Sequence, residues 1–277
     1  MAVFDRVFAM SSPSPRLAAL AALAHEAGAI IMRHYAAGTE ARTKSDHSPV
    51  TDADEEAEAH ILRGLHALAP GVPVVAEEEV AAGRLPAVEN HFFLVDPLDG
   101  TKEFISHNGE FTVNIAEVEN GVAIRGVVYA PAKNRLFLGE APGGAWEIEI
   151  DVAAKPDFAH AKPIHVRRPP ADGLVAVASR SHRDKKTEEY LAAYPVKDFI
   201  TAGSSLKFCL VAAGEADIYP RHGTTMEWDT AAGHAVLAAA GGSIVTGEGA
   251  ALLYGKPGFK NPWFVASGPT VPLPVAQ

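Results

Sequence analysis

The chain has 277 residues, of which 48% are hydrophobic and 21% charged, a composition typical of a globular protein with a sizeable buried core. Its 24 Lys and Arg against 34 Asp and Glu give a formal net charge of −10. This charge disfavours a nucleic-acid polymer as partner, because phosphate backbones are bound by basic surfaces. An anionic substrate would therefore need local cations, either basic side chains or bound metal.

The single cysteine, Cys209, excludes an intrachain disulfide and a cysteine-based zinc cluster, and favours a reducing compartment such as the cytoplasm. The longest early apolar stretch, Leu17 to Ala24, is much shorter than the ~20 residues that span a bilayer. We therefore predict neither a transmembrane segment nor a signal peptide. Peripheral attachment to the inner membrane and the oligomeric state both stay open.

The first half of the chain begins with two predicted helices. Ser14 and Pro15 are typical of a helix start, and apolar residues at helical spacing continue to Gly38. A second helix is expected over residues 55–68. Short β-rich segments follow, which we expect to form one sheet covered by these helices: 72–76, 92–95, 111–118, 122–129 and 135–138.

Residues 141–170 contain many Gly and Pro residues and are predicted to connect two halves, residues 1–140 and 141–277. After this connection the pattern predicts a strand over 174–178. Helices are expected over 184–193, 206–213 and 230–240. Two α/β halves with a seam between them follow from this order, the first with most of the acidic motifs and the second with candidate substrate-binding segments.

Acidic residues gather where predicted elements end, which is where functional sites are usually built. The apolar strand over 92–95 leads into Asp-Pro-Leu-Asp-Gly-Thr, a turn that should aim Asp96 and Asp99 outward together. Two carboxylates about 4 Å apart repel by ~4 kcal/mol at an effective dielectric near 20, so a cluster of them must protonate or hold cations. Magnesium prefers such oxygen ligands and leaves positions for substrate phosphates, which would turn an acidic pocket into a phosphate site.

Each acidic residue also has a simpler structural interpretation. An Asp-Gly pair such as that at Asp99 is common in hairpin turns. Thr51 and Asp54 match a capping box, and the glutamates at 77–79 could be a solvated charge run. Asp229 precedes a predicted helix and could be its N-cap. These roles do not exclude metal binding, because a capping carboxylate can also bind a cation.

Four motifs in chain order resemble the inositol monophosphatase superfamily of metal-dependent, lithium-sensitive phosphatases: SPVTDAD at 48–54, EE at 77–78, DPLDGT at 96–101 and EWDTAAG at 227–233. Three further stretches resemble its 3′(2′),5′-bisphosphate nucleotidase branch, CysQ: DGTKEFI at 99–105, NGEFTVNIA at 108–116 and GSSLKFCLV at 203–211. The similarity extends over roughly residues 15–265. It implies a mixed α and β chain folded as a layered αβαβα sandwich, with the active site between the two halves.

The resemblance also implies roles for individual residues. Asp54 and Thr101 would activate the attacking water. Two or three Mg²⁺ ions would be bound. One ligand would be Glu78, because the family ligand is the second glutamate of its acidic pair. The other ligands would be Asp96, Asp99, Asp229 and the backbone carbonyl of Leu98. Phosphate ester hydrolysis agrees with these roles, since it needs a positioned water and neutralisation of charge on the phosphoryl and leaving oxygens.

Candidate substrate contacts come mainly from the second half. Gly-Ser-Ser at 203–205 precedes an apolar helical stretch, which would suit an anion pocket, with an ordinary serine N-cap as the alternative. Lys207 and Arg221 would bind a second, non-reacting phosphate, with a solvated lysine and arginine as the alternative. His182 lies where the branch holds its nucleoside, but it could equally be a surface histidine. The full predicted set is Gly100, Ser179, His182, Gly203, Ser204, Ser205, Lys207 and Arg221.

The resemblance implies Mg-dependent hydrolysis of the 3′-phosphate of adenosine 3′,5′-bisphosphate to AMP, in sulfur metabolism, with its sulfated relative as a second candidate substrate. Inositol monophosphatase activity is the first alternative, disfavoured because a monophosphate leaves no second phosphate for Lys207 and Arg221. A catalytically silent metal-binding scaffold is the second, disfavoured by the presence of Asp54 and Thr101. The chain has neither a P-loop motif nor a G-x-S-x-G elbow, which argues against those phosphate and ester enzymes.

Overall fold

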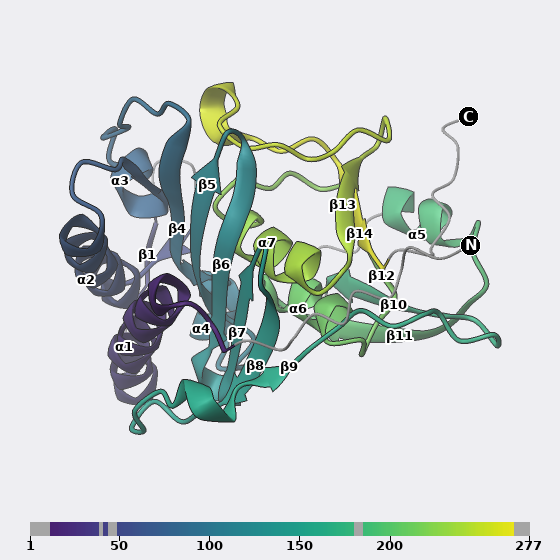
Figure 1. Cartoon of the computed structure of the whole chain (residues 1–277), viewed down its shortest axis with the longest axis horizontal. Helices are drawn as coiled ribbons and strands as arrows, with labels where there is room; N and C mark the ends of the chain where they lie inside the picture. The colour runs from purple at the N-terminus through teal and green to yellow at the C-terminus, as the bar shows by residue number, and fades with distance from the viewer. Residues whose placement is uncertain (1–11, 39–40, 44–48, 180–184, 269–277) are drawn as a thin grey trace.

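The computed structural model describes residues 12–38, 41–43, 49–179 and 185–268. Helices and sheets alternate in five layers, which follow one another from left to right in Figure 1. Helices α1 and α2 cover one face of a seven-stranded sheet, and α6 and α7 cover the other. A five-stranded sheet packs on the far side of α6 and α7, and α5 lies against it. The predicted αβαβα sandwich is confirmed.

The helix α1 (Pro15–Ala37) begins and ends as its sequence predicts. The Ser14 hydroxyl oxygen accepts the Leu17 N–H at 3.2 Å, and Gly38 ends the helix with a φ of 73°. Of the helices in the described part of the chain, α1 alone has the length and hydropathy to cross a membrane. Here it packs on α2 and the seven-stranded sheet and buries eight residues, as a core helix does.

The seven-stranded sheet has the order β3-β4-β5-β6-β7-β8-β9, and all its pairs are antiparallel except β3 with β4. The helix α2 (Asp52–Leu68) packs on β4. The strands are β3 (Val74–Ala76), β4 (His91–Asp99), β5 (Thr112–Glu119), β6 (Val122–Ala130), β7 (Arg135–Glu140), β8 (Gly144–Glu149) and β9 (Lys162–Pro163).

Strands β8 and β9 correct one expectation. They lie in the stretch predicted to connect two halves, and they extend the first sheet to Pro163. The apolar side chains of Trp146 and Ile148 are buried in β8 while Glu149 is exposed. The Gly and Pro residues around this strand concealed its alternation in the sequence.

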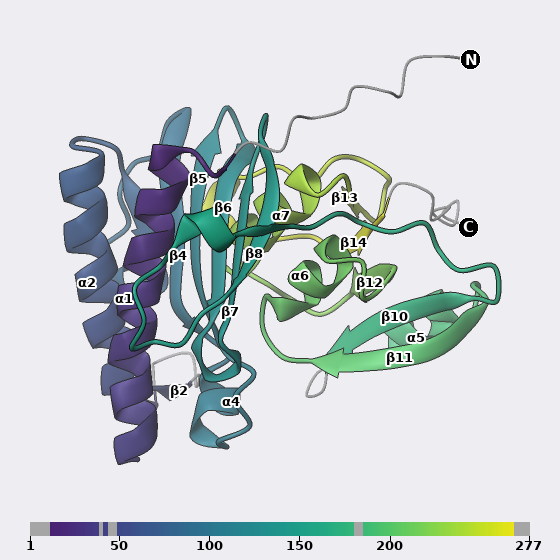
Figure 2. The same cartoon turned by 60° about the horizontal axis from the view of Figure 1, so that its bottom comes forward.

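The five-stranded sheet has the order β11-β10-β12-β14-β13, with β10 parallel to β11 and β12 (Figure 2). Its strands are β10 (Leu174–Ser179), β11 (Val196–Ala202), β12 (Ile218–Arg221), β13 (Ser243–Thr246) and β14 (Phe264–Ser267). Only β10 was predicted. The helices of this half are α5 (Lys185–Leu191), α6 (Leu206–Ala212) and α7 (Ala231–Ala239), near the predicted positions. The remaining short elements are β1 (Arg42–Thr43), β2 (Pro49–Val50), α3 (Glu77–Ala81), α4 (Thr101–Ile105), and the 3-10 turns at Pro131–Lys133, Phe158–His160 and Pro257–Phe259.

The seam between the two sheets is filled by α7, which approaches the first sheet closely. A Cβ on Gly126 would lie 2.2 Å from the Ala232 carbonyl oxygen, and one on Gly139 would lie 2.5 Å from the Val236 Cα. Only glycine therefore permits this approach. One core cluster includes residues from both sheets and from α6 and α7, so the loops at the ends of these elements are held in fixed relative positions.

Candidate active site

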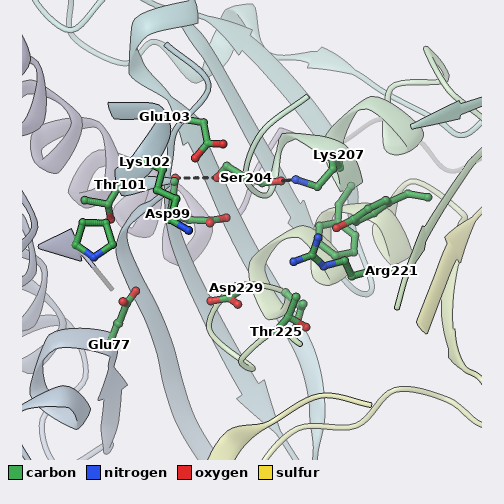
Figure 3. Close-up of a pocket in the computed structure, with 15 residues that line it drawn as sticks. Glu77, Asp99, Thr101, Lys102, Glu103, Ser204, Lys207, Arg221, Thr225 and Asp229 are labelled. Atoms are coloured by element: carbon green, nitrogen blue, oxygen red, sulfur yellow. Dashed lines mark hydrogen bonds between the residues drawn. The ribbon is translucent and has the colours of Figure 1, made fainter. Parts of the chain in front are cut away.

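A cavity of about 230 Å³ lies where β4, α3, α6, β12 and the loop before α7 meet (Figure 3). Residues far apart in the sequence contribute to it. The turn after β4 and the short helix α4 form one wall, and β12 with α6 forms the opposite wall. The lining residues are Pro49, Glu77, Asp99, Gly100, Thr101, Lys102, Glu103, Ser204, Lys207, Phe208, Tyr219, Arg221, Thr225, Asp229 and Thr230.

The turn at the end of β4 positions two of the predicted carboxylates. Pairing with β5 shifts register between Asp96 and Asp99, so the chain leaves the regular ladder there. An Asp96 carboxylate oxygen accepts the Leu98 N–H at 3.0 Å, which tightens the turn. Gly100 then takes a φ of 98°, a conformation that favours glycine, and the chain enters α4. Asp99 lines the cavity as predicted, whereas Asp96 is buried and is not among the lining residues, so the expectation that both side chains point outward together is wrong for Asp96.

The predicted pair Asp54 and Thr101 is in contact. The Thr101 hydroxyl donates to Asp54 Oδ1 at 3.2 Å, and the Leu98 carbonyl oxygen is a second acceptor at 3.4 Å. The other Asp54 oxygen accepts the N–H and the hydroxyl of Thr51 at 2.8 and 2.7 Å, which completes a capping box at the start of α2. Asp54 therefore combines the capping role with a contact to the cavity wall.

The carboxylates around the cavity repel one another strongly. Burial raises the pKa of Asp96 well above its usual value, and the charges of Glu77, Asp99 and Asp229 add to this rise. Burial and the Asp99 charge also raise the pKa of Asp229. The Met226 N–H, which donates to the Asp229 carboxylate at 2.7 Å, opposes this rise. Asp229 is not the N-cap of α7, because Thr230 occupies that position. The simpler interpretation of Asp229 is thus wrong.

The expectation that Glu78 faces the site is contradicted by the structure. Glu77, the first glutamate of the run, lines the cavity and points toward Asp99 and Asp229 in Figure 3. Glu78 lines a separate hollow of about 500 Å³ with Glu58 and Arg84. The difference arises because the run is the first turn of α3, where successive side chains point about 100° apart. The candidate ligand is therefore Glu77.

The donor chemistry of the site fits a hard divalent cation. Glu77, Asp96, Asp99 and Asp229 offer carboxylate oxygens, and the Leu98 carbonyl belongs to the same turn, so every donor is oxygen. In the described part of the chain, no three His, Cys, Asp or Glu side chains lie close enough to form a compact metal-binding group. Glu77, Asp99 and Asp229 line the cavity without forming such a compact group.

The wall opposite the carboxylates is cationic. Lys207 is 5% exposed, and its ammonium donates to the Ser204 carbonyl oxygen at 2.5 Å and lies 5.5 Å from the centre of the Tyr219 ring. Burial lowers the pKa of Lys207 to about 8, although the Asp99 charge opposes this shift. The Nε of Arg221 is buried and makes no hydrogen bond. Both predicted cations line the cavity, and the Arg221 guanidinium retains a buried donor for an anion.

The Gly-Ser-Ser segment at 203–205 connects the two halves of the site. The Ser204 hydroxyl donates to the Asp99 carbonyl oxygen at 2.9 Å, and the Ser205 hydroxyl donates to the Asp229 carbonyl oxygen at 2.7 Å. Ser205 is the N-cap of α6 but makes no side-chain cap bond. Only Ser204 of the three lines the cavity. The serine hydroxyls thus hold the walls together, and an anion pocket formed by this segment stays a prediction.

Some predicted residues cannot be placed, and some lining residues were not predicted. His182 and Ser48 lie outside the described residues, and of Ser179 only the backbone at the end of β10 is described. Asn114 lies within a motif but was not named as a site residue; its amide donates to Asp99 Oδ2 at 3.4 Å and to the Ser205 hydroxyl at 3.0 Å. Tyr219 was missed because β12 was not predicted as a strand, whereas Arg221 on the same strand was named from the family resemblance.

Comparison with known proteins shows the family to which the chain belongs. The model of the inositol monophosphatase family matches residues 12–265. The chain belongs to the inositol monophosphatase family. It is 47% identical over 251 residues to the 3′(2′),5′-bisphosphate nucleotidase CysQ of Escherichia coli strain K12, an alignment that covers 88% of this chain and 96% of that protein.

Solved structures of the family have the same fold. The crystal structure of CysQ from Bacteroides thetaiotaomicron is 38% identical, with a TM-score of 0.76, and the match covers 90% of this chain and 96% of that one. The IMPase of Thermotoga maritima is 24% identical with a TM-score of 0.74, covering 92% of each chain, and this likeness concerns the fold alone.

Proposed function

We propose that this protein is a magnesium-dependent 3′(2′),5′-bisphosphate nucleotidase that hydrolyses the 3′-phosphate of adenosine 3′,5′-bisphosphate to give AMP and phosphate. The observation that carries the proposal is the cavity with two unlike walls, one of carboxylates and one with Lys207 and Arg221. A bisphosphate presents two phosphates to these walls. The relatives named as CysQ nucleotidases support the same substrate class.

The residues Thr101 and Asp54 would activate the attacking water. When Thr101 donates its proton to Asp54 Oδ1, its oxygen lone pairs are free to accept a proton from a water in the cavity. Asp54 is 2% exposed and fixed by two bonds from Thr51, so it holds the threonine hydroxyl in one orientation. This proton path is a reason to expect catalysis and not a silent regulatory scaffold.

The carboxylate wall would hold the cations. Glu77, Asp96, Asp99 and Asp229 would bind two or three Mg²⁺ ions with the Leu98 carbonyl. Bound Mg²⁺ would neutralise the phosphoryl and leaving oxygens and lower the pKa of coordinated water. The buried Asp96 and Asp229 carry raised pKa values without cations, so metal binding would displace protons from this wall.

The cationic wall would select the substrate. Arg221 has a buried Nε without a hydrogen bond, and Lys207 is a buried ammonium whose hydrogen bond in the structure goes to a backbone carbonyl. Charge-assisted bonds from these two groups would hold the phosphate that is not hydrolysed. The sulfated relative of the bisphosphate carries the same 3′-phosphate, and we extend the proposal to it. The single cysteine fits a role in the cytoplasm.

The test is an assay of phosphate release by the purified protein from adenosine 3′,5′-bisphosphate and from inositol 1-phosphate, with Mg²⁺ and with a chelator. We expect Mg-dependent release that is at least ~100-fold faster, by kcat/KM, from the bisphosphate, since each charge-assisted bond contributes about 1.5–3 kcal/mol. Equal rates on both esters would replace this proposal with inositol monophosphatase activity. Release that the chelator leaves unchanged would refute the metal-dependent mechanism.

A further inference from the structure

Glu58 is a buried carboxylate that the proposed mechanism does not use. It lies on α2 four residues after Asp54, so the two acidic side chains lie on the same buried face of that helix, 3% and 2% exposed. Asp54 contacts Thr101 on one side of the cavity. Glu58 extends instead toward the first turn of α3.

Both oxygens of Glu58 accept backbone N–H groups of that turn. Oε2 accepts from Glu78 at 2.8 Å and Oε1 accepts from Glu79 at 2.9 Å. These are the second and third residues of α3, whose N–H groups an N-cap side chain ordinarily binds. The N-cap of α3 is Ala76, which has no side-chain acceptor. Glu58 therefore caps α3 from another helix.

A buried carboxylate from another helix is a costly way to cap α3 if the cap serves only to stabilise the helix. Burial raises the pKa of Glu58 to about 8, and the two amide bonds oppose that rise by favouring the ionised form. A serine or aspartate at position 76 could bind the same amides without burying a remote carboxylate. The unusual cap points to a requirement for the exact orientation of α3.

The residue whose orientation depends on α3 is Glu77. The helix is only five residues long, too short to hold its own geometry, and Glu77 is its first residue. On the outer side, Glu79 forms a two-bond ion pair with Arg84 at 2.6 and 2.7 Å. The turn is thus fixed by Glu58 from within and by Arg84 from outside, and Glu77 extends from it into the cavity.

We propose that Glu58 is a positioning residue for metal binding: by binding the N–H groups of Glu78 and Glu79, it directs the Glu77 carboxylate into the cavity. The inference rests on the proposed function, in which Glu77 is a metal ligand. Glu58 itself does not contact the cations. Its effect should therefore appear in metal affinity and disappear when Glu77 can no longer act as a ligand.

The test compares Glu58→Gln with Glu55→Gln in the full chain. Glutamine keeps the size of Glu58 but has one oxygen acceptor, and its amide nitrogen would face the second N–H. Glu55 lies on the same helix and lines the same hollow, but its side chain is 54% exposed. Binding of Mn²⁺ is measured by calorimetry and by electron paramagnetic resonance, with Mg²⁺ as competitor, alongside Tm without metal.

We expect Glu58→Gln to weaken Mn²⁺ binding about tenfold or more, as loss of groups that orient metal ligands usually does. Tm should stay within about 4 °C of the unmodified protein, and Glu55→Gln should bind Mn²⁺ within about twofold. In a Glu77→Gln background, Glu58→Gln should add little further loss, because the two residues act through one ligand. This non-additivity distinguishes positioning from general stabilisation.

Unchanged Mn²⁺ affinity in folded Glu58→Gln would overturn the inference, and so would a loss that adds fully to that of Glu77→Gln. If Glu77→Gln itself binds Mn²⁺ normally, the metal site of the proposed function fails as well, and the two failures are thereby distinguished. If Glu58→Gln does not fold, Glu58→Asp, which keeps the charge on a shorter side chain, should show an intermediate loss of affinity. Failure of both variants to fold would assign Glu58 to stability and overturn the proposal.

Discussion

Replacing Glu77 by glutamine should impair metal-dependent activity, whereas the same replacement at the adjacent Glu78 should leave it nearly unchanged. Glu77 lines the cavity and its charge raises the pKa values of Asp96 and Asp229, so its carboxylate acts on the same space as theirs. Glu78 lines the separate hollow beside α2. Its N–H, which donates to Glu58, is kept in the Glu78→Gln variant. The two variants therefore make the same chemical change, and they differ only in whether the altered side chain lines the cavity.

The expected effect of Glu77→Gln follows from the loss of one charge beside a cation. At about 4 Å and an effective dielectric near 20, a carboxylate and a unit positive charge interact by ~4 kcal/mol. Even one of the two unit charges of Mg²⁺ thus corresponds to about a 1000-fold loss of affinity, which we take as the smallest expected effect. Removing the Glu78 charge outside the cavity should change the affinity by no more than about threefold, since solvent screens such interactions.

The assay is a Mg²⁺ titration of phosphate release from adenosine 3′,5′-bisphosphate by both variants and the unmodified protein. Half-maximal activation should move to far higher Mg²⁺ in Glu77→Gln and stay nearly constant in Glu78→Gln. Circular dichroism and Tm serve as controls for folding. The reverse pattern, with Glu78→Gln impaired and Glu77→Gln active, would refute the assignment of Glu77 to the site.

Four further predictions concern three sets of residues that line the same cavity and one glycine in the core. Asp99→Asn and Asp229→Asn should each lower kcat/KM by about 1000-fold at fixed Mg²⁺ while circular dichroism is unchanged, because each removes one carboxylate charge from the cavity. Thr101→Ala should lower kcat by about 100-fold or more with metal binding kept, as measured by calorimetry. Lys207→Met should raise KM for the bisphosphate by about 10–100-fold, and in the unmodified protein KM should rise as the pH passes about 8 because Lys207 loses its proton. Gly126→Ala should destabilise the fold by ~1–3 kcal/mol in thermal unfolding, since the new Cβ would lie 2.2 Å from the Ala232 carbonyl oxygen.

The parts of the fold that the sequence predicted are those set by local patterns. The cap at Ser14, the apolar spacing along α1 and the turn at Gly38 lie within one helix, and the structure confirms them. The turn after β4 was predicted for the same reason, because Pro97 and Gly100 constrain its backbone directly. Short strands such as β12, with four residues, carry no pattern long enough to detect.

The parts that could not be predicted depend on contacts between distant residues. The Ser204 hydroxyl bonds a carbonyl 105 residues away, and the Ser205 hydroxyl accepts from an amide 91 residues away. The direction in which the Glu77 side chain points is set by α3, and the start of α3 is capped by Glu58, whose carboxylate accepts the N–H of a residue 20 positions later. A motif alone gives the three glutamates, and only the packing of α3 decides which one faces the cavity.

The net charge of −10 and an anionic substrate are reconciled by the separation of charge within the cavity. The carboxylate wall is not suited to bind phosphate by itself, because its groups are anionic or, like Asp96, have a pKa raised by burial and by the charges of their acidic neighbours. Cations bound there would reverse the sign of that wall, while Lys207 and Arg221 on the other wall are positive without metal. Binding of the second phosphate should therefore persist when metal is removed. An equilibrium titration of AMP, which has only the 5′-phosphate, should accordingly give a Kd that a chelator changes little in the unmodified protein and that Lys207→Met raises.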